Sequence, residues 1–148
     1  MIHSASPRLL LYLVFSFGFI CCKKERINLE AFWDCHNALH LDSAAISSRI
    51  RGTWAWQTQH CYWGPSFQLP RKSTMVTFYS NHKYSVQDES NIRTEGDWQL
   101  ELVDKSLYGL RLSSPVDFLY GRILFCDDQL LLNDSYIDGC DNLFKRVK

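Results

Sequence analysis

The stretch RGTWAWQTQHCYWG, residues 51–64, decides the fold, because the side-chain pattern changes at Gly52. From that glycine onward the side chains alternate with a period of two, which is typical of a β-strand with one buried face. The alternate positions rich in large rings are Trp54, Trp56, Thr58, His60 and Tyr62. We therefore interpret the stretch as the first wall of a sheet rather than as a catalytic surface.

Short β-branched and aromatic segments follow, separated by turn-forming residues at intervals of roughly 8 to 12 positions. Counted with the first, they predict about eight strands in meander order, an arrangement that can close on itself and leave no exposed edge. Before them, residues 32–51 show only loose helical spacing. The predicted fold class is all-β: an eight-stranded antiparallel meander barrel preceded by a short helix or an irregular cap.

Charge and length limit the classes of function. The chain has 148 residues, which favours one domain, and its 16 Lys and Arg balance its 16 Asp and Glu. A net charge near zero provides no long-range field for a polyanion, so we expect no nucleic-acid partner.

The N-terminal segment has the features of an export signal. Residues 9–20, LLLYLVFSFGFI, form an apolar run too short to span a bilayer but typical of a signal h-region. The run ends in CCKKE, which resembles the lipobox of bacterial lipoproteins and implies lipidation at Cys22, with Cys21 as the alternative. An uncleaved signal anchor and a simple secreted protein also remain open.

This interpretation divides the chain into three parts. Residues 1–21 are the predicted signal peptide, residues 22–50 a lipid-anchored tether and cap, and residues 51–148 the barrel. The expected location is the cell envelope, with the protein anchored through lipid to a bacterial outer membrane on its periplasmic or outer face.

Gly52-Thr53-Trp54 at the start of the first strand and Arg146 near the end of the last resemble the lipocalin pattern. A shorter pattern, similar to that of the lipocalin-like lipoproteins of Bacteroidetes, is matched by Thr77-Phe78, Lys83-Tyr84, Gly96-Asp97-Trp98, Leu130-Leu131-Leu132 and Phe144-Lys145-Arg146. The resemblance covers residues 50–146. It implies that Trp54 closes one end of the barrel, beside Gly52, and that Arg146 packs across it.

Four cysteines remain after the signal, and an exported chain would oxidise them. Their wide spacing argues against zinc. In the predicted meander the eighth strand neighbours the first, which brings Cys140 beside Cys61. Cys35 and Cys126 then lie near the other end, so we predict the disulfides Cys61–Cys140 and Cys35–Cys126. A Cys126–Cys140 bridge would have to span a strand length of about 15 Å, beyond disulfide reach.

Two functions from different classes fit these features. The first is the binding of a small apolar ligand in or at the mouth of the barrel; the candidate lining residues are Trp54, Trp56, His60, Phe78, Tyr84, Trp98 and Leu100. The second is a filled-core interaction or inhibitor protein that docks an envelope protein through the loop at residues 62–70, which contains Tyr62, Trp63 and Phe67. His60 has a second interpretation as a rim histidine bonded to backbone or water.

No residue set predicts a reaction, a cofactor or a metal. His36 and His40 have metal-ligand spacing near Asp34, but solvated surface explains them better. The carboxylates of Glu95, Asp97 and Glu101 fall on polar strand positions rather than in a closed cleft. The aspartates between residues 127 and 141 lack a calcium-loop layout and fit turns, where Asp side chains accept hydrogen bonds from nearby amides. We expect a protein that is not an enzyme.

Replacing the predicted lipidation site tests the anchor. A fatty-acid probe should label the wild type and fail to label Cys22→Ser, because only a thiol at the processed terminus accepts the acyl group. Cys21→Ser is the control and should affect labelling less. Unchanged labelling of Cys22→Ser would move the site to Cys21 or remove it.

Overall fold

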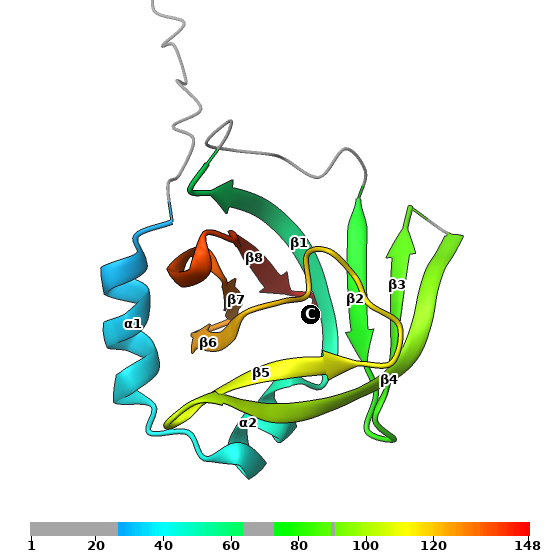
Figure 1. Ribbon diagram of the computed structural model, residues 1–148. Helices are drawn as coiled ribbons and strands as arrows, with labels where there is room; N and C mark the ends of the chain where they lie inside the picture. The colour runs from blue at the N-terminus through cyan, green and yellow to red at the C-terminus, as the bar shows by residue number, and fades with distance from the viewer. Residues whose placement is uncertain (1–26, 64–72, 90) are drawn as a thin grey trace, which may run out of the picture.

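The computed structural model describes residues 27–63, 73–89 and 91–148, so the predicted signal, Cys21, Cys22 and Phe67 lie outside the described residues. Eight antiparallel strands form a closed barrel in sequence order, as predicted (Figure 1). The strands are β1 Gly52–Cys61, β2 Thr74–Phe78, β3 Lys83–Asp88, β4 Asn91–Asp104, β5 Leu107–Leu112, β6 Arg122–Cys126, β7 Gln129–Asn133 and β8 Cys140–Arg146. A short 3-10 helix, η1 (Ser135–Ile137), precedes β8.

Two helices stand before the barrel where an irregular cap was one expectation. They are α1 (Leu29–Ala38) and α2 (Ser43–Ile50). Each begins after a side-chain cap: Asn28 accepts a hydrogen bond from the backbone N–H of Ala31 at 3.2 Å, and Asp42 accepts one from that of Ala45 at 2.8 Å. The predicted tether therefore gives way to helix at Leu29.

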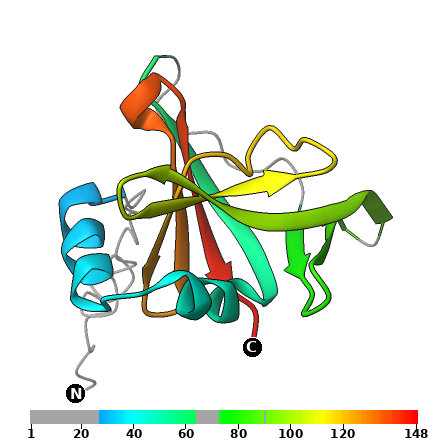
Figure 2. The same ribbon diagram turned by 60° about the horizontal axis from the view of Figure 1, so that its bottom comes forward.

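The second helix, α2, closes one end of the barrel. It runs beneath the strands, beside the C-terminus (Figure 2). Ile46 and Ile50 on this helix belong to the main hydrophobic core together with Trp54. The Trp54 indole N–H donates to the carbonyl of Ile50 at 2.7 Å, so the ring is both packed and satisfied in its hydrogen bonding.

Arg146 lies across the same end. Its guanidinium stands 4.2 Å from the centre of the Trp54 ring and donates to the carbonyls of Arg51, at 2.9 Å, and Arg49. A Cβ at Gly52 would come within 2.8 Å of the Arg146 Nη1, and the backbone there has φ +117°. Glycine is therefore needed at position 52 both for its backbone angle and for the room it leaves to the arginine.

The connection between β5 and β6 fills the interior. Residues 113–121 bring Val116, Phe118 and Leu119 into the core. The Phe118 ring stacks on the Trp56 ring, with centroids 4.4 Å apart and an angle of 13° between the planes. The centroid of the Phe144 ring lies 6.3 Å from that of Phe118. The barrel around these rings is therefore packed with side chains, as small eight-stranded barrels often are.

A β-bulge between Trp56 and Thr58 corrects the predicted alternation of β1. Beyond it Thr58 pairs with Leu143, and Leu143 packs in an outer cluster beneath α1. Because directly paired residues share a face, Thr58 and His60 point out of the barrel, away from the side that Trp54 and Trp56 occupy. The alternation had placed His60 on the same face as Trp54 and Trp56, and the bulge puts it on the opposite face.

Both predicted disulfides are confirmed. Cys61 and Cys140 are directly paired residues on β1 and β8, with Cα atoms 4.1 Å apart. Cys35 on α1 is bonded to Cys126 at the end of β6, with Cα atoms 5.4 Å apart. One bridge thus joins the first and last strands, and the other fastens the first helix to the barrel wall.

His36 lies on the inner side of α1 and is buried, whereas the sequence predicted that it lies on the solvated surface. Its Nδ1 accepts a hydrogen bond from the backbone N–H of Phe125 at 3.1 Å. Strand β6 pairs with β5 only at Gly109 and Arg122, so β5 does not reach this amide. The histidine supplies the acceptor that a neighbouring strand would otherwise provide.

Trp54→Ala should lower the free energy of unfolding by about 3 to 5 kcal/mol, the range for truncating a buried tryptophan. Trp63→Ala is the matched control, since Trp63 is 71% exposed and surface changes usually stay within about 0.5 kcal/mol. Urea unfolding with both disulfides intact measures the difference. Equal midpoints for the two variants would show that Trp54 does not close the barrel.

The stability should fall on acidification because of His36. Burial, reinforced by the positive charge of Arg49, lowers the pKa of His36 from its ordinary value of 6.5. The unfolded state then binds the proton more readily. The stability that neutral His36 contributes is therefore fully present above its pKa in the unfolded state, and it is lost as the pH falls through its pKa in the folded state. In urea unfolding at several pH values, His36→Gln should flatten this dependence, whereas the exposed control His40→Gln should leave it unchanged. Parallel profiles for wild type and His36→Gln would contradict this role.

Candidate functional site

The predicted lining residues are mainly core residues that contact one another. Trp54, Phe78, Tyr84 and Trp98 are at most 1% exposed, whereas Trp56 and Leu100 are partly buried. The Phe78 ring lies 5.8 Å from that of Trp98 and 6.4 Å from that of Tyr84. These side chains hold the barrel together from the inside.

Polar atoms of the core are satisfied at one end of the barrel and not at the other. The Tyr84 hydroxyl donates to the carbonyl of Ser114, and the Trp98 indole N–H donates to that of Tyr79 at 3.3 Å. Nearer the Cys61–Cys140 end, the Trp56 Nε1 and the Asn142 Oδ1 are buried and make no hydrogen bond within the described part of the chain. The end that carries this disulfide is therefore the less completely satisfied one.

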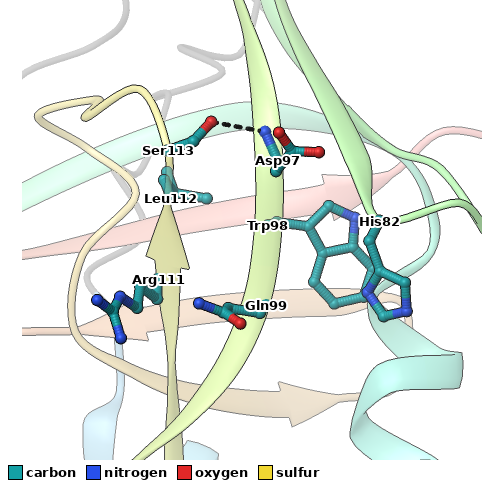
Figure 3. Close-up of a pocket in the computed structure, with 7 residues that line it drawn as sticks. All are labelled: His82, Asp97, Trp98, Gln99, Arg111, Leu112 and Ser113. Atoms are coloured by element: carbon teal, nitrogen blue, oxygen red, sulfur yellow. Dashed lines mark hydrogen bonds between the residues drawn. The ribbon is translucent and has the colours of Figure 1, made fainter.

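One open surface pocket has a volume of about 680 Å³ and is drawn in Figure 3. In it the Asp97 backbone N–H donates a hydrogen bond to the Ser113 hydroxyl at 2.8 Å. This bond joins β4 to the start of the connection between β5 and β6. The Asp97 carboxylate pairs with Lys83 at 2.6 Å, and the His82 ring lies against the buried Trp98. These polar contacts support the sheet, and the aromatic rings of the pocket are those of the exposed His82 and the buried Trp98.

The second pocket, of about 400 Å³, lies outside the barrel between α1 and the strands that carry the Cys61–Cys140 bridge. We call it the α1 groove. Its lining includes residues of the N-terminal turn of α1 and of the orange-red connection that precedes β8, two elements drawn in Figure 1. Its lining residues are Ile27, Leu29, Trp33, His60, Tyr62, Arg122, Asn133, Ser135, Tyr136 and Asp141.

Asp141 builds one side of the α1 groove. Its buried carboxylate accepts hydrogen bonds from the Asn133 amide at 2.8 Å and from the backbone N–H groups of Asp134 and Ser135 at 2.9 and 3.0 Å. The Ser135 hydroxyl adds a fourth bond at 2.9 Å. This carboxylate fixes η1, which agrees with the interpretation that the aspartates of this segment form turns. Burial, together with the negative charge of Asp141, raises the pKa of Asp134.

Three aromatic side chains form the walls of the groove: Trp33 from α1, Tyr62 from the end of β1 and Tyr136 from η1. The Arg122 guanidinium lies 3.5 Å from the centre of the Tyr136 ring and pairs with Asp104 at 2.9 Å. Tyr136 is nevertheless 43% exposed. The arginine therefore holds one face of the ring and leaves the ring accessible from the groove.

A second exposed surface adjoins the groove, and we call it the rim patch: Tyr62, Trp63 and Ile137. The rings of Tyr62 and Trp63 meet at 81° with centroids 5.0 Å apart. The Trp63 indole N–H donates to the Asp138 carboxylate at 3.2 Å, which joins the end of β1 to the β8 side of the barrel. The exposed fractions are 64% for Tyr62, 71% for Trp63 and 63% for Ile137.

Of the groove residues, three were predicted from the sequence: His60 as a candidate ligand-lining residue, Tyr62 as a residue of the docking loop and Asp141 as a turn residue. Trp33, Arg122 and Tyr136 were missed. Trp33 follows the core residue Phe32 directly and is itself partly buried, and this aromatic pair at the start of a capped helix was the one signal that could have revealed it. Arg122 and Tyr136 come together only through the closure of the barrel, which no local spacing records.

Within residues 27–63, 73–89 and 91–148, one cluster has the composition of a metal site: Cys35, Cys126 and Asp127. Its two sulfur atoms are bonded to each other, and a disulfide does not provide the thiolates that metals bind. In the same part of the chain no helix is long and apolar enough to cross a membrane.

Comparisons with protein families, with curated proteins and with solved structures return no match to this chain.

Proposed function

We propose that the protein is a non-enzymatic, lipid-anchored binding protein of the bacterial outer membrane, similar to the lipocalin-like lipoproteins of Bacteroidetes, which holds a small ligand in the α1 groove. The observation that carries the proposal is the contrast between the packed interior and the open groove beside the mouth. Phe118 occupies the space next to Trp56 and Phe144, whereas the groove offers about 400 Å³ between aromatic walls.

The groove has the composition of a small-molecule site. Such sites combine apolar and aromatic walls with a few fixed polar groups in volumes of about 300 to 1,000 Å³. The walls here come from elements that are fixed to one another by covalent bonds: α1 through Cys35–Cys126, and the ends of β1 and β8 through Cys61–Cys140. A ligand in the groove would therefore meet a preorganised surface, which lowers the entropy cost of binding.

The anchor and the family rest on sequence features. The apolar run at residues 9–20 followed by CCKKE supports export and lipidation, and Gly52-Thr53-Trp54 with Arg146 supports the lipocalin-like relationship. Packing of Arg146 over Trp54, above the end that α2 covers, is the arrangement this relationship implies.

A second candidate function is docking of another envelope protein through the rim patch. The observation that favours it is the Trp63 side chain, 71% exposed but held in place by its bond to Asp138. Exposed, oriented tryptophan and tyrosine side chains are common anchors of protein interfaces.

Native mass spectrometry of protein purified from the membrane of the cells that make it separates the two candidates. The chain should carry a bound small molecule, which Trp33→Ala should lose and Trp63→Ala should retain, because only Trp33 lines the groove. The opposite result, in which no small molecule is bound and a protein partner is lost only with Trp63→Ala, would replace the groove with the rim patch. Equal thermal unfolding of the two variants serves as the control for folding.

A further inference from the structure

We infer that the ligand class of the α1 groove is a neutral saccharide, whose ring packs on the partly exposed Tyr136 and the partly buried Trp33 that line the groove; this inference rests on the proposed function of the groove.

The aromatic surfaces suit a ring with an apolar face and a polar edge. Tyr136 is held from one side by Arg122 at 3.5 Å and is still 43% exposed. Trp33 lines the side of the groove that α1 forms, and its ring meets the ring of the buried His36 edge-on, with an angle of 79° between the planes. A cyclic sugar presents C–H groups on its faces, which pack on such rings by dispersion and by weak C–H to π contacts.

The polar groups of the walls fall into two sets. Asn133, Ser135 and Asp141 bond to one another and hold η1. By contrast, the hydroxyls of Tyr62 and Tyr136 and the indole N–H of Trp33 take no part in this network. These donors stand at the edges of aromatic rings, where the hydroxyl groups of a stacked sugar would meet them.

The charges that line the groove disfavour an ionic ligand. Arg122 contributes one positive charge; its Nη2 pairs with Asp104 at 2.9 Å, and its buried Nε has no hydrogen-bond partner within the described residues. Asp141 contributes one negative charge, and both of its oxygens are engaged. A carboxylate or phosphate would meet the Asp141 charge, and an ammonium group would meet Arg122. A neutral polar molecule meets no unfavourable charge.

The small number of aliphatic side chains in the lining disfavours a lipid chain. Only Ile27 and Leu29 are aliphatic among the lining residues, and both lie at the N-terminal end of α1. The remaining wall is aromatic or polar. With about 400 Å³, the groove has room for a mono- or disaccharide.

The test is a titration of the full mature chain, labelled with ¹⁵N and with both disulfides formed, followed through the indole signals of its tryptophans. The probes are glucose, galactose, mannose and N-acetylglucosamine as methyl β-glycosides, together with decanoate and N-phenyl-1-naphthylamine as apolar probes. At least one glycoside should shift the Trp33 indole signal in a saturable way at millimolar concentration. The signal of the buried Trp98 should stay in place.

Matched variants locate the site. Tyr136→Leu, which keeps apolar bulk but removes the flat ring, should weaken glycoside binding by about tenfold or more, in line with the loss of an aromatic contact. Tyr136→Phe, which removes only the hydroxyl, should weaken it several-fold. Tyr120→Leu is the control, because Tyr120 is 44% exposed but does not line the groove, and it should bind like wild type.

The outcomes distinguish this inference from the proposed function. If only decanoate or N-phenyl-1-naphthylamine shifts the Trp33 signal, the groove binds ligands but the saccharide inference is overturned. Glycoside binding that is unchanged in both Tyr136 variants also overturns it. If no probe shifts the Trp33 signal and no small molecule is retained in the purified protein, the proposed function fails as well.

Discussion

The contact between Arg146 and Trp54 is the constraint on which the rest of the structure depends. The arginine joins the last strand to the backbone that enters the first, through its bonds to the carbonyls of Arg49 and Arg51. It also covers the ring that α2 packs against. A lysine at this position would lack the planar fork that reaches two carbonyls while it stacks on an indole. Closure of the sheet, position of the second helix and burial of the core thus depend on one side chain and on the missing side chain of Gly52.

The barrel is closed unevenly. Strands β1 and β8 share a long ladder that ends in the Cys61–Cys140 bridge, whereas β5 and β6 are paired only at Gly109 and Arg122. The connection at residues 113–121 passes inward at this weak seam and fills the interior. On the outer side His36 accepts the hydrogen bond that β5 leaves unmade. The same departure of β5 thus accounts for a packed interior and for a helix that is tightly held against the outer wall.

Most of the fold was accessible from sequence because its signals are local. Alternation in β1 and turn residues between strands predicted the meander, and the meander together with the even cysteine count predicted both disulfides. The alternation did not reveal the bulge after Trp56, since a bulge inserts a residue without changing the residue types. His60 was therefore placed on the wrong face. His36 was misassigned because its acceptor role depends on a strand pair missing elsewhere in the barrel. The groove could not be predicted from the sequence either, because Trp33, Arg122 and Tyr136 come together only when the barrel has closed.

The Cys35–Cys126 bridge determines how a mechanical load would travel through the molecule. It links positions 91 residues apart in the sequence and lies on the first helix after the proposed anchor. A pull on the N-terminal end of α1 would pass through this covalent link into β6, which is held by its ladder with β7 and by the single pair with β5. It would bypass α2 and β1, so the ladder that closes the barrel would not be the first to carry the force. A protein held by its N-terminal end would thus bear the load on β6 and its neighbours.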